Sequence, residues 1–333
     1  MTRILSPPKL LISFLAAGLA VFFSLPSPGG ARHSLVGMPY REGTGFEKRS
    51  VRAGSIWAGP RLRSPVRVAL ASRRILLVSD YREKAIIALK RPSLRPVWTL
   101  AVPGRPSGIA STKRRLFVGN ETTGSVEVYN MAGTWLYDLG GEKGNVQQPT
   151  DIAIDSGRGL VFVVDGHDKV IKVFDVAGPL VRTISEPGPE LHQLAHPTGI
   201  ALDKINQQVL VSDYGDPATG LSARVQIYDY TGEHVGAIVG NDVVPQEYRF
   251  SRPQGLAVDG RGRIFLVDSL LGQVLVFDRA SGTGVKILGS YGSDPGQLLL
   301  PLDVVLAARS KDVFVTNNRS GRVEVFSKGG MVP

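Results

Sequence analysis

The sequence predicts an all-β fold, a six-bladed β-propeller whose ring is closed by an N-terminal strand. Two observations predict it. Six segments align with one another, and each opens with Pro and closes 14 to 16 residues later with Asp or Asn. After each closing residue, a short polar loop leads into a segment in which Val, Ile, Phe or Tyr occupies alternate positions, which is the period of a β-strand. The opening segments cover residues 65–80, 106–120, 149–165, 197–213, 253–268 and 301–317.

Each repeat has room for four strands. The opening segment supplies the first two, and the alternating segment is the third. Third strands are expected at residues 84–90, 125–130, 169–175, 224–229, 273–278 and 322–327. Turn residues come next, and fourth strands are expected at residues 134–139, 179–184 and 233–238. The opening prolines are 41, 43, 48, 56 and 48 residues apart, which fits one four-stranded blade per repeat.

The last repeat reaches Pro333 just after its third strand, so its fourth strand must come from elsewhere. Residues 46–57 precede the first repeat and are predicted to supply it, pairing beside residues 322–327. Such a closure would leave no open sheet edge in the ring.

The N-terminal residues differ from the repeats. Arg3 and Lys9 precede an apolar run at residues 10–25, and small residues follow, so residues 1–31 have the layout of a secretory signal peptide. Residues 32–45 are then a linker, and residues 46–333 form the propeller. The alternative is an uncleaved signal anchor, although the run is short for a membrane span of roughly 20 residues. We expect a secreted or periplasmic protein that meets a membrane only through that anchor, if it is retained.

The 333-residue chain contains no cysteine, which excludes disulfides, thiolate metal sites and thiol nucleophiles. Its charge is uneven, because residues 41–115 hold 18 Lys and Arg against 4 Asp and Glu, whereas residues 116–333 hold 18 against 25. The basic part predicts either an acidic partner or a solvated flank that aids solubility. Export argues against nucleic acid as that partner. The basic residues considered are Arg61, Arg63, Arg67, Arg73, Arg74, Arg82, Arg105, Lys113, Arg114 and Arg115.

The repeats resemble those of the NHL family, which run roughly as Pro-x-Gly-Ile-Ala-x-Asp followed by a Val-x-Asp strand end and an Arg-Ile-x-Val-Phe strand. The matching segments are PTDIAID at 149–155, PTGIALD at 197–203, PQGLAVD at 253–259, RVQIYD at 224–229 and RVEVF at 322–326. The resemblance covers nearly all of residues 46–328. It implies the six-bladed fold and leaves function open, since one fold hosts many activities.

The residue that closes each opening segment has two interpretations. Asp and Asn at a strand end commonly hydrogen-bond their own turn, so these residues are predicted to be turn caps. The other interpretation is contact with a ligand or metal ion. The closing residues are Asp80, Asn120, Asp165, Asp213, Asp268 and Asn317.

We expect no cofactor, with a Ca or Zn ion as the possibility to test. Histidines near the closing residues make a metal site between the third and fourth blades conceivable, but they lack close ligand spacing and solvated loop histidines are the alternative. The candidate metal ligands are Asn120, Asp165, His167, His196, Asp213, Asp268 and Asn317.

Two blades carry longer insertions, at residues 214–223 and 239–252. Long loops on a rigid scaffold often carry function, and their aromatic and charged residues resemble the composition of binding surfaces; neutral insertion is the alternative. The candidate ligand-binding residues are Tyr214, Asp216, Tyr248, Arg252, Arg82 and Arg319.

The sequence favours a binding or scaffolding module for a protein or an acidic envelope component, and its oligomeric state stays open. The alternative is a hydrolase, lactonase or lyase that uses a divalent metal in a central pocket. Peptide-amidating lyases resemble this repeat but use Cys, which this chain lacks. The similar gluconolactonase and senescence-marker group uses a Glu, Asn and Asp set around a central ion. Asn120, Asn317 and Asp213 match part of that set, but the first repeat opens with PVRVAL, and no Glu stands at that opening. A subunit of a larger envelope complex is a third possibility.

Overall fold

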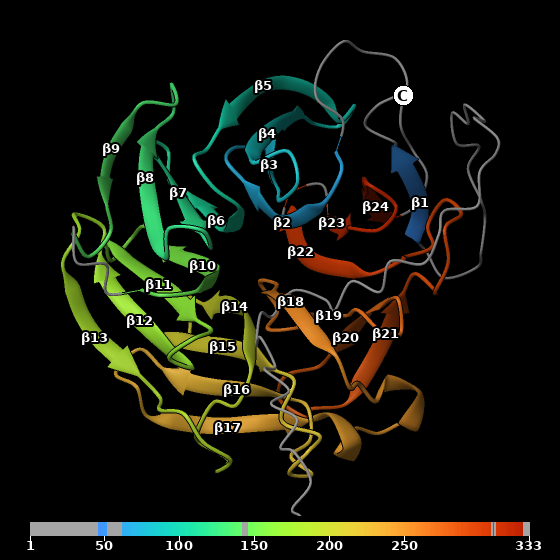
Figure 1. Ribbon diagram of the computed structural model, residues 1–333. Helices are drawn as coiled ribbons and strands as arrows, with labels where there is room; N and C mark the ends of the chain where they lie inside the picture. Colours follow the sequence, from blue (N-terminus) through green and yellow to red (C-terminus); the bar gives the residue numbers. More distant parts are fainter. Residues whose placement is uncertain (1–45, 52–61, 142–145, 308, 310, 329–333) are drawn as a thin grey trace, which may run out of the picture.

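The structure is a computed structural model that describes residues 46–51, 62–141, 146–307, 309 and 311–328. In these residues the strands form six separate four-stranded antiparallel sheets. Figure 1 shows the sheets arranged as blades around a common centre. The predicted all-β, six-bladed propeller is therefore confirmed. The predicted signal peptide, the linker and residues 52–57 lie outside the described residues.

The four strands of a blade follow one another outward from the centre (Figure 1). The innermost strands are β2 (Pro65–Leu70), β6 (Pro106–Ser111), β10 (Pro149–Asp155), β14 (Pro197–Asp203), β18 (Pro253–Val258) and β22 (Pro301–Ala307). The second strands are β3 (Ile75–Asp80), β7 (Arg115–Asn120), β11 (Leu160–Asp165), β15 (Gln208–Asp213), β19 (Ile264–Asp268) and β23 (Asp312–Asn317). The third strands are β4 (Ala85–Lys90), β8 (Ser125–Asn130), β12 (Val170–Asp175), β16 (Arg224–Asp229), β20 (Gln273–Phe277) and β24 (Arg322–Lys328). The outermost strands of the first five blades are β5 (Arg95–Ala101), β9 (Trp135–Asp138), β13 (Leu180–Ile184), β17 (His234–Val239) and β21 (Gly284–Leu288).

The opening proline of every repeat is the first residue of an innermost strand. Proline fits there because it has no N–H to donate and its φ is fixed. The register of each innermost strand then shifts just after the proline, for example between Pro65 and Arg67 and between Pro301 and Asp303. We call the face at which these strands begin the upper face and the opposite face the lower face.

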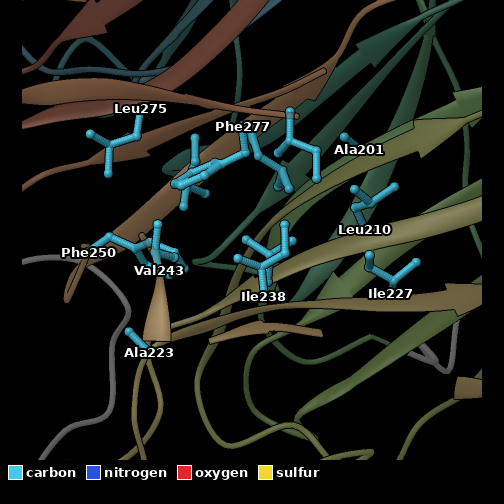
Figure 2. Packing of buried hydrophobic residues seen from close by; sticks show 13 residues of the cluster. Ala201, Leu210, Ala223, Ile227, Ile238, Val243, Phe250, Leu275 and Phe277 are labelled. Atoms are coloured by element: carbon cyan, nitrogen blue, oxygen red, sulfur yellow. The ribbon is translucent and has the colours of Figure 1, made fainter. Parts of the chain in front are cut away.

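Apolar clusters join each blade to the next. The cluster between the fourth and fifth blades contains Leu210 and Ile238 on one side and Leu275 and Phe277 on the other (Figure 2). The last and first blades pack in the same way, through Phe314 of β23 and Val78 of β3 among others. Burial of these side chains between blades is the main stabilising term of the ring.

Strand β1 (Phe46–Val51) lies antiparallel to β24, with Phe46 opposite Lys328 and Val51 opposite Val323. It is the fourth strand of the last sheet. That this strand closes the ring stays a prediction.

The connection from β17 to β18 contains two short 3₁₀ helices, η1 (Gly240–Asp242) and η2 (Gln246–Tyr248). Within the described part of the chain, no helix has the length and apolar character needed to span a membrane.

Candidate functional site

The propeller axis is surrounded by the third residue of each innermost strand. In blade order these residues are Arg67, Gly108, Asp151, Gly199, Gly255 and Asp303. The glycines allow the strands to approach closely. At Gly199 an added Cβ would lie 2.5 Å from the carbonyl oxygen of Gln254, which is backbone and cannot move aside.

Arg67 fills the centre. Its side chain is buried, with Nε donating to the carbonyl of Thr150 at 3.1 Å and Nη1 to that of Leu302 at 3.1 Å. Nη2 donates to the carbonyl of Thr198. Two buried carboxylates flank the guanidinium, Asp151 at 3.6 Å and Asp303 at 3.9 Å. One arginine thus ties four blades together around the axis. The sequence placed Arg67 in the basic flank and did not anticipate this role.

Each axial carboxylate is held by backbone donors. Asp151 accepts from the N–H of Ile152 and Ile200, and Asp303 accepts from the N–H of Val68. Burial raises the pKa of Asp151, and Arg67 opposes the rise. Burial also raises the pKa of Asp303 to about 8, with the negative charge of Asp151 as the next cause. The axis therefore binds a proton that the unfolded chain does not bind between about pH 4 and pH 8.

We expect stability to fall as pH rises through this window. A folded state that binds more protons than the unfolded state loses stability with rising pH, until the folded group itself ionises near pH 8. Asp303→Asn keeps an oxygen for the Val68 N–H but cannot ionise. The variant should therefore lose less stability than the parent between pH 5 and pH 8, measured as urea midpoints. Parallel curves for the two proteins would contradict this expectation.

The cavities differ on the two sides of Arg67. On the upper side, a space of about 10 Å³ is lined by Arg67, Glu121 and polar side chains such as Thr150 and Gln254. On the lower side, a cavity of about 300 Å³ is lined mainly by aliphatic residues of the six innermost strands, with Asp151 and Asp303 in its wall. The space at the centre of the upper face has room for about one water molecule, so a larger ligand there would contact the surface around it.

Two tyrosine–arginine pairs stand on the upper face. The guanidinium of Arg105 lies 5.2 Å from the ring centroid of Tyr81, and Nη1 also contacts the Tyr81 hydroxyl at 3.2 Å. The guanidinium of Arg252 lies 4.9 Å from the ring centroid of Tyr214. In both pairs the tyrosine follows the closing Asp of one blade and the arginine precedes the opening proline of the next. The arrangement is therefore repeated between blades one and two and between blades four and five.

His196 extends the second pair. Its ring stacks on Tyr214 with centroids 4.6 Å apart and planes inclined by 11°. His196 and Tyr214 are half-buried and Arg252 is exposed, which leaves a flat polar and aromatic shelf open to solvent. Beside the first pair, burial raises the pKa of Glu121, and the charges of Arg105 and Arg67 oppose the rise.

The structure separates the other predicted ligand-binding residues. Asp216 closes its own loop through backbone hydrogen bonds with Leu221, and its side chain accepts from the Ala218 N–H at 3.0 Å. Tyr248 packs against Gly284, the first residue of β21, where an added Cβ would fall 1.9 Å from the Tyr248 Cγ. Arg82 and Arg319 are exposed on the upper loops of the first and last blades. Tyr214 and Arg252 are the predicted residues that come together.

The interpretation of the closing residues as turn caps is confirmed for five of the six. Asp213 accepts from the N–H of Gly215 in its own turn and from the N–H of Ala195 and His196 in the segment that enters the same blade, at 2.8 to 3.0 Å. Asp80, Asp165 and Asp268 make both kinds of bond as well. Asn120 accepts from the Thr122 N–H of its own turn, whereas Asn317 accepts from the Leu299 N–H of the entering segment.

These bonds leave the closing residues poorly suited to hold a metal ion. Asn317 accepts from the Leu299 N–H and donates to the carbonyl of Gln297, and Asn120 donates to Glu127. Asp165 pairs with Lys172 at 2.8 Å. His167 contacts Asp168 in an exposed turn, away from the axis. Across the described ranges, no three His, Asp or Glu side chains gather as a metal-ion site. The metal hypothesis stays a prediction that elemental analysis of the purified protein tests.

Comparisons with known proteins agree with this architecture. No family model matches the chain. A stretch of 145 residues, 43% of the chain, is 24% identical to the protein brain tumor of Drosophila melanogaster, and the match covers 12% of that protein. A stretch of 162 residues, 49% of the chain, is 24% identical to the E3 ubiquitin-protein ligase NHLRC1 of Rattus norvegicus and covers 35% of it. A solved gluconolactonase from Xanthomonas campestris superposes with a TM-score of 0.62 at 15% identity, covering 84% of this chain and 89% of that one.

The sheets and the repeated caps define a six-bladed β-propeller built from NHL-type repeats. The chain is a distant homologue of the NHL-repeat proteins. It matches only a minor part of the length of those two relatives, and the likeness to the gluconolactonase concerns the fold.

Proposed function

We propose that this protein is a binding module whose upper face takes an acidic peptide segment of a partner protein. The observation that carries the proposal is the repeated tyrosine–arginine pair, Tyr81 with Arg105 and Tyr214 with Arg252. Tyr and Arg are the residues most enriched at the energetic centres of protein interfaces. An arginine already placed over a ring loses less side-chain entropy when it binds a carboxylate.

Arg67 fills the propeller axis below the upper face, which supports binding of a partner across the upper face and not within the axis. The guanidinium of Arg67 is held by three carbonyl groups, and the space above it is about 10 Å³. A small-molecule substrate needs a concave pocket, and such pockets commonly reach several hundred Å³, far more than the space on the upper side of Arg67. The cavity of about 300 Å³ lies on the lower side and is lined mainly by aliphatic residues. A partner that lies across the upper face would instead span the two tyrosine–arginine pairs.

The rival hydrolase or lactonase hypothesis requires a divalent ion at the centre of the upper face. The residues at that centre favour this ion little. The positive charge at the axis is that of Arg67, and the asparagines considered as ligands are engaged in turn hydrogen bonds. The gluconolactonase likeness rests on the fold and does not carry the activity over.

The same proposal includes the compartment in which the protein acts. The apolar run at residues 10–25 supports export, so we place the partner outside the cytoplasm. Intact-mass measurement of the mature protein tests this, because cleavage near residue 31 removes the run.

An array of acidic, neutral and basic peptides tests the binding proposal directly. The wild-type protein should retain acidic peptides that contain aromatic residues. The double variant Arg105→Ser and Arg252→Ser should bind these peptides about tenfold more weakly. Arg261→Ser is the matched control, because Arg261 is an exposed arginine on the lower face. Equal losses in the control, or no preference for acidic peptides, would overturn the proposal. Metal-dependent turnover of lactones or esters would favour the enzyme instead.

A further inference from the structure

The lower face of the last, first and second blades carries a dense group of cations. They lie on the turns between the first and second strands and between the third and fourth strands. We call them the basic surface, which consists of the exposed residues Arg73, Arg74, Lys90, Arg95, Lys113, Arg114, Arg309 and Lys311. Turns 71–74, 91–94, 112–114 and 309–311 contain no Asp or Glu.

Hydrogen bonds and an ion pair connect these turns into one surface. Arg91 donates through its backbone N–H to the carbonyl of Arg74 at 2.8 Å and through Nη1 to that of Arg73 at 3.1 Å. The Oγ of Ser111, next to the 112–114 turn, contacts the carbonyl of Leu70 at 3.4 Å. Arg91 also reaches Asp312 of the last blade at 3.5 Å. The basic surface is therefore continuous across three blades.

The rest of the lower face is closer to neutral, because Asp and Glu residues share its turns with the cations. Arg158 lies 3.3 Å from Asp155, Arg263 lies 2.7 Å from Asp259, and Arg279 pairs with Asp203. Asp312, an acid beside the basic surface, is occupied by Arg91 and by the Ser327 hydroxyl at 2.7 Å. The net positive charge of the lower face is thus concentrated on the basic surface.

We propose that the lower face docks on an anionic lipid bilayer, with the basic surface against the headgroups. Cations on the turns of several blades can approach one plane together, and each Lys or Arg near an anionic membrane adds to binding. This inference concerns the face opposite the peptide-binding face and does not rest on the proposed function.

Two further observations favour a bilayer over another polyanion. Ile205, at the tip of the lower turn between β14 and β15 of the fourth blade, lies outside the basic surface but on the same face, and it is 78% exposed. An exposed apolar residue there suits the boundary between headgroups and acyl chains when the whole lower face meets the bilayer. Strand β1 begins at Phe46, opposite Lys328 at the lower end of β24. The chain therefore enters the propeller from the lower face, and the apolar run ends 21 residues earlier, at Leu25.

Vesicle sedimentation with the full chain tests the inference. Vesicles of phosphatidylglycerol and phosphatidylcholine should bind the protein more tightly than phosphatidylcholine alone, and the difference should shrink as salt rises. The triple substitution Arg74→Gln, Lys113→Gln and Arg114→Gln should weaken binding to the anionic vesicles by about tenfold or more. The control Lys84→Gln, Lys169→Gln and Arg249→Gln removes the same charge outside the basic surface and should bind as the parent does.

The isoleucine separates a bilayer from other polyanions. Ile205→Ser should weaken binding to the anionic vesicles and leave retention on heparin, used as a polyanion probe, unchanged. Equal binding to both kinds of vesicle would overturn the inference, because it would indicate partition of the apolar run alone. Heparin binding lost with the basic surface, together with vesicle binding indifferent to Ile205→Ser, would assign the surface to a polysaccharide.

Discussion

Arg67→Met should lower the free energy of unfolding by about 3–5 kcal/mol at neutral pH, the cost of breaking a buried ion pair by removing one partner. Methionine fills much of the space, so the loss reports the charge and the hydrogen bonds. Three carbonyl groups, including those of Thr150 and Leu302, lose a donor, and Asp151 and Asp303 keep their burial without a cation. Urea unfolding of both proteins measures the difference.

A triple variant separates charge from packing. Arg67→Met combined with Asp151→Asn and Asp303→Asn removes all three ionisable groups while keeping similar volumes. Replacement of a whole buried ionic group by neutral residues is often near neutral, so the triple variant should recover at least half of the loss. If the free energy of unfolding of Arg67→Met alone lies within about 1 kcal/mol of that of the parent, the axis needs no cation.

Asp213→Asn should cost about 3–5 kcal/mol, because it leaves a buried guanidinium without its carboxylate. Asp213 lies 3.1 Å from the Nη2 of Arg224, both side chains are almost fully buried, and Asp213 also caps its turn. An amide keeps one acceptor oxygen for the turn but cannot neutralise the cation. Thermal and urea unfolding should both show the loss.

Asp268→Asn provides the matched comparison. Asp268 caps the fifth blade through the N–H groups of Arg252 and Leu270, in the same position as Asp213. Its cross-strand partner is Gln273, where the fourth blade has Arg224. The cost of this substitution should therefore be that of a weakened cap, about 1–3 kcal/mol. Equal losses for Asp213→Asn and Asp268→Asn would show that the cation at Arg224 contributes nothing.

The blades themselves could be predicted from the sequence. Strand alternation, the opening prolines and the closing Asp or Asn are local signals, and each strand pairs with the next strand along the chain. Even the caps were predictable, since an Asp such as Asp80 binds N–H groups two and three residues further on. The pairing of residues 46–51 beside the third strand of the last repeat was also predicted, and β1 lies beside β24. That this strand closes the ring stays a prediction.

The basic segment shows where the sequence misleads. Residues 41–115 read as one positive flank, but successive strands of a blade run in opposite directions and send neighbouring turns to opposite faces. Arg67 goes to the axis, Arg82 and Arg105 to the upper face, and Arg73 and Arg114 to the lower face. A single run of charge in the sequence thus becomes three separate environments.

The sequence by itself determined the number of blades, their strands and their caps, because these depend on residues close together in the chain. The tertiary structure decided the rest. Arg67 meets Thr150 from 83 residues away and Leu302 from 235 residues away, because ring closure brings the same position of each repeat to one axis. The tyrosine–arginine pairs also join different blades. No local pattern encodes such contacts, because they form only when all six blades pack in a ring.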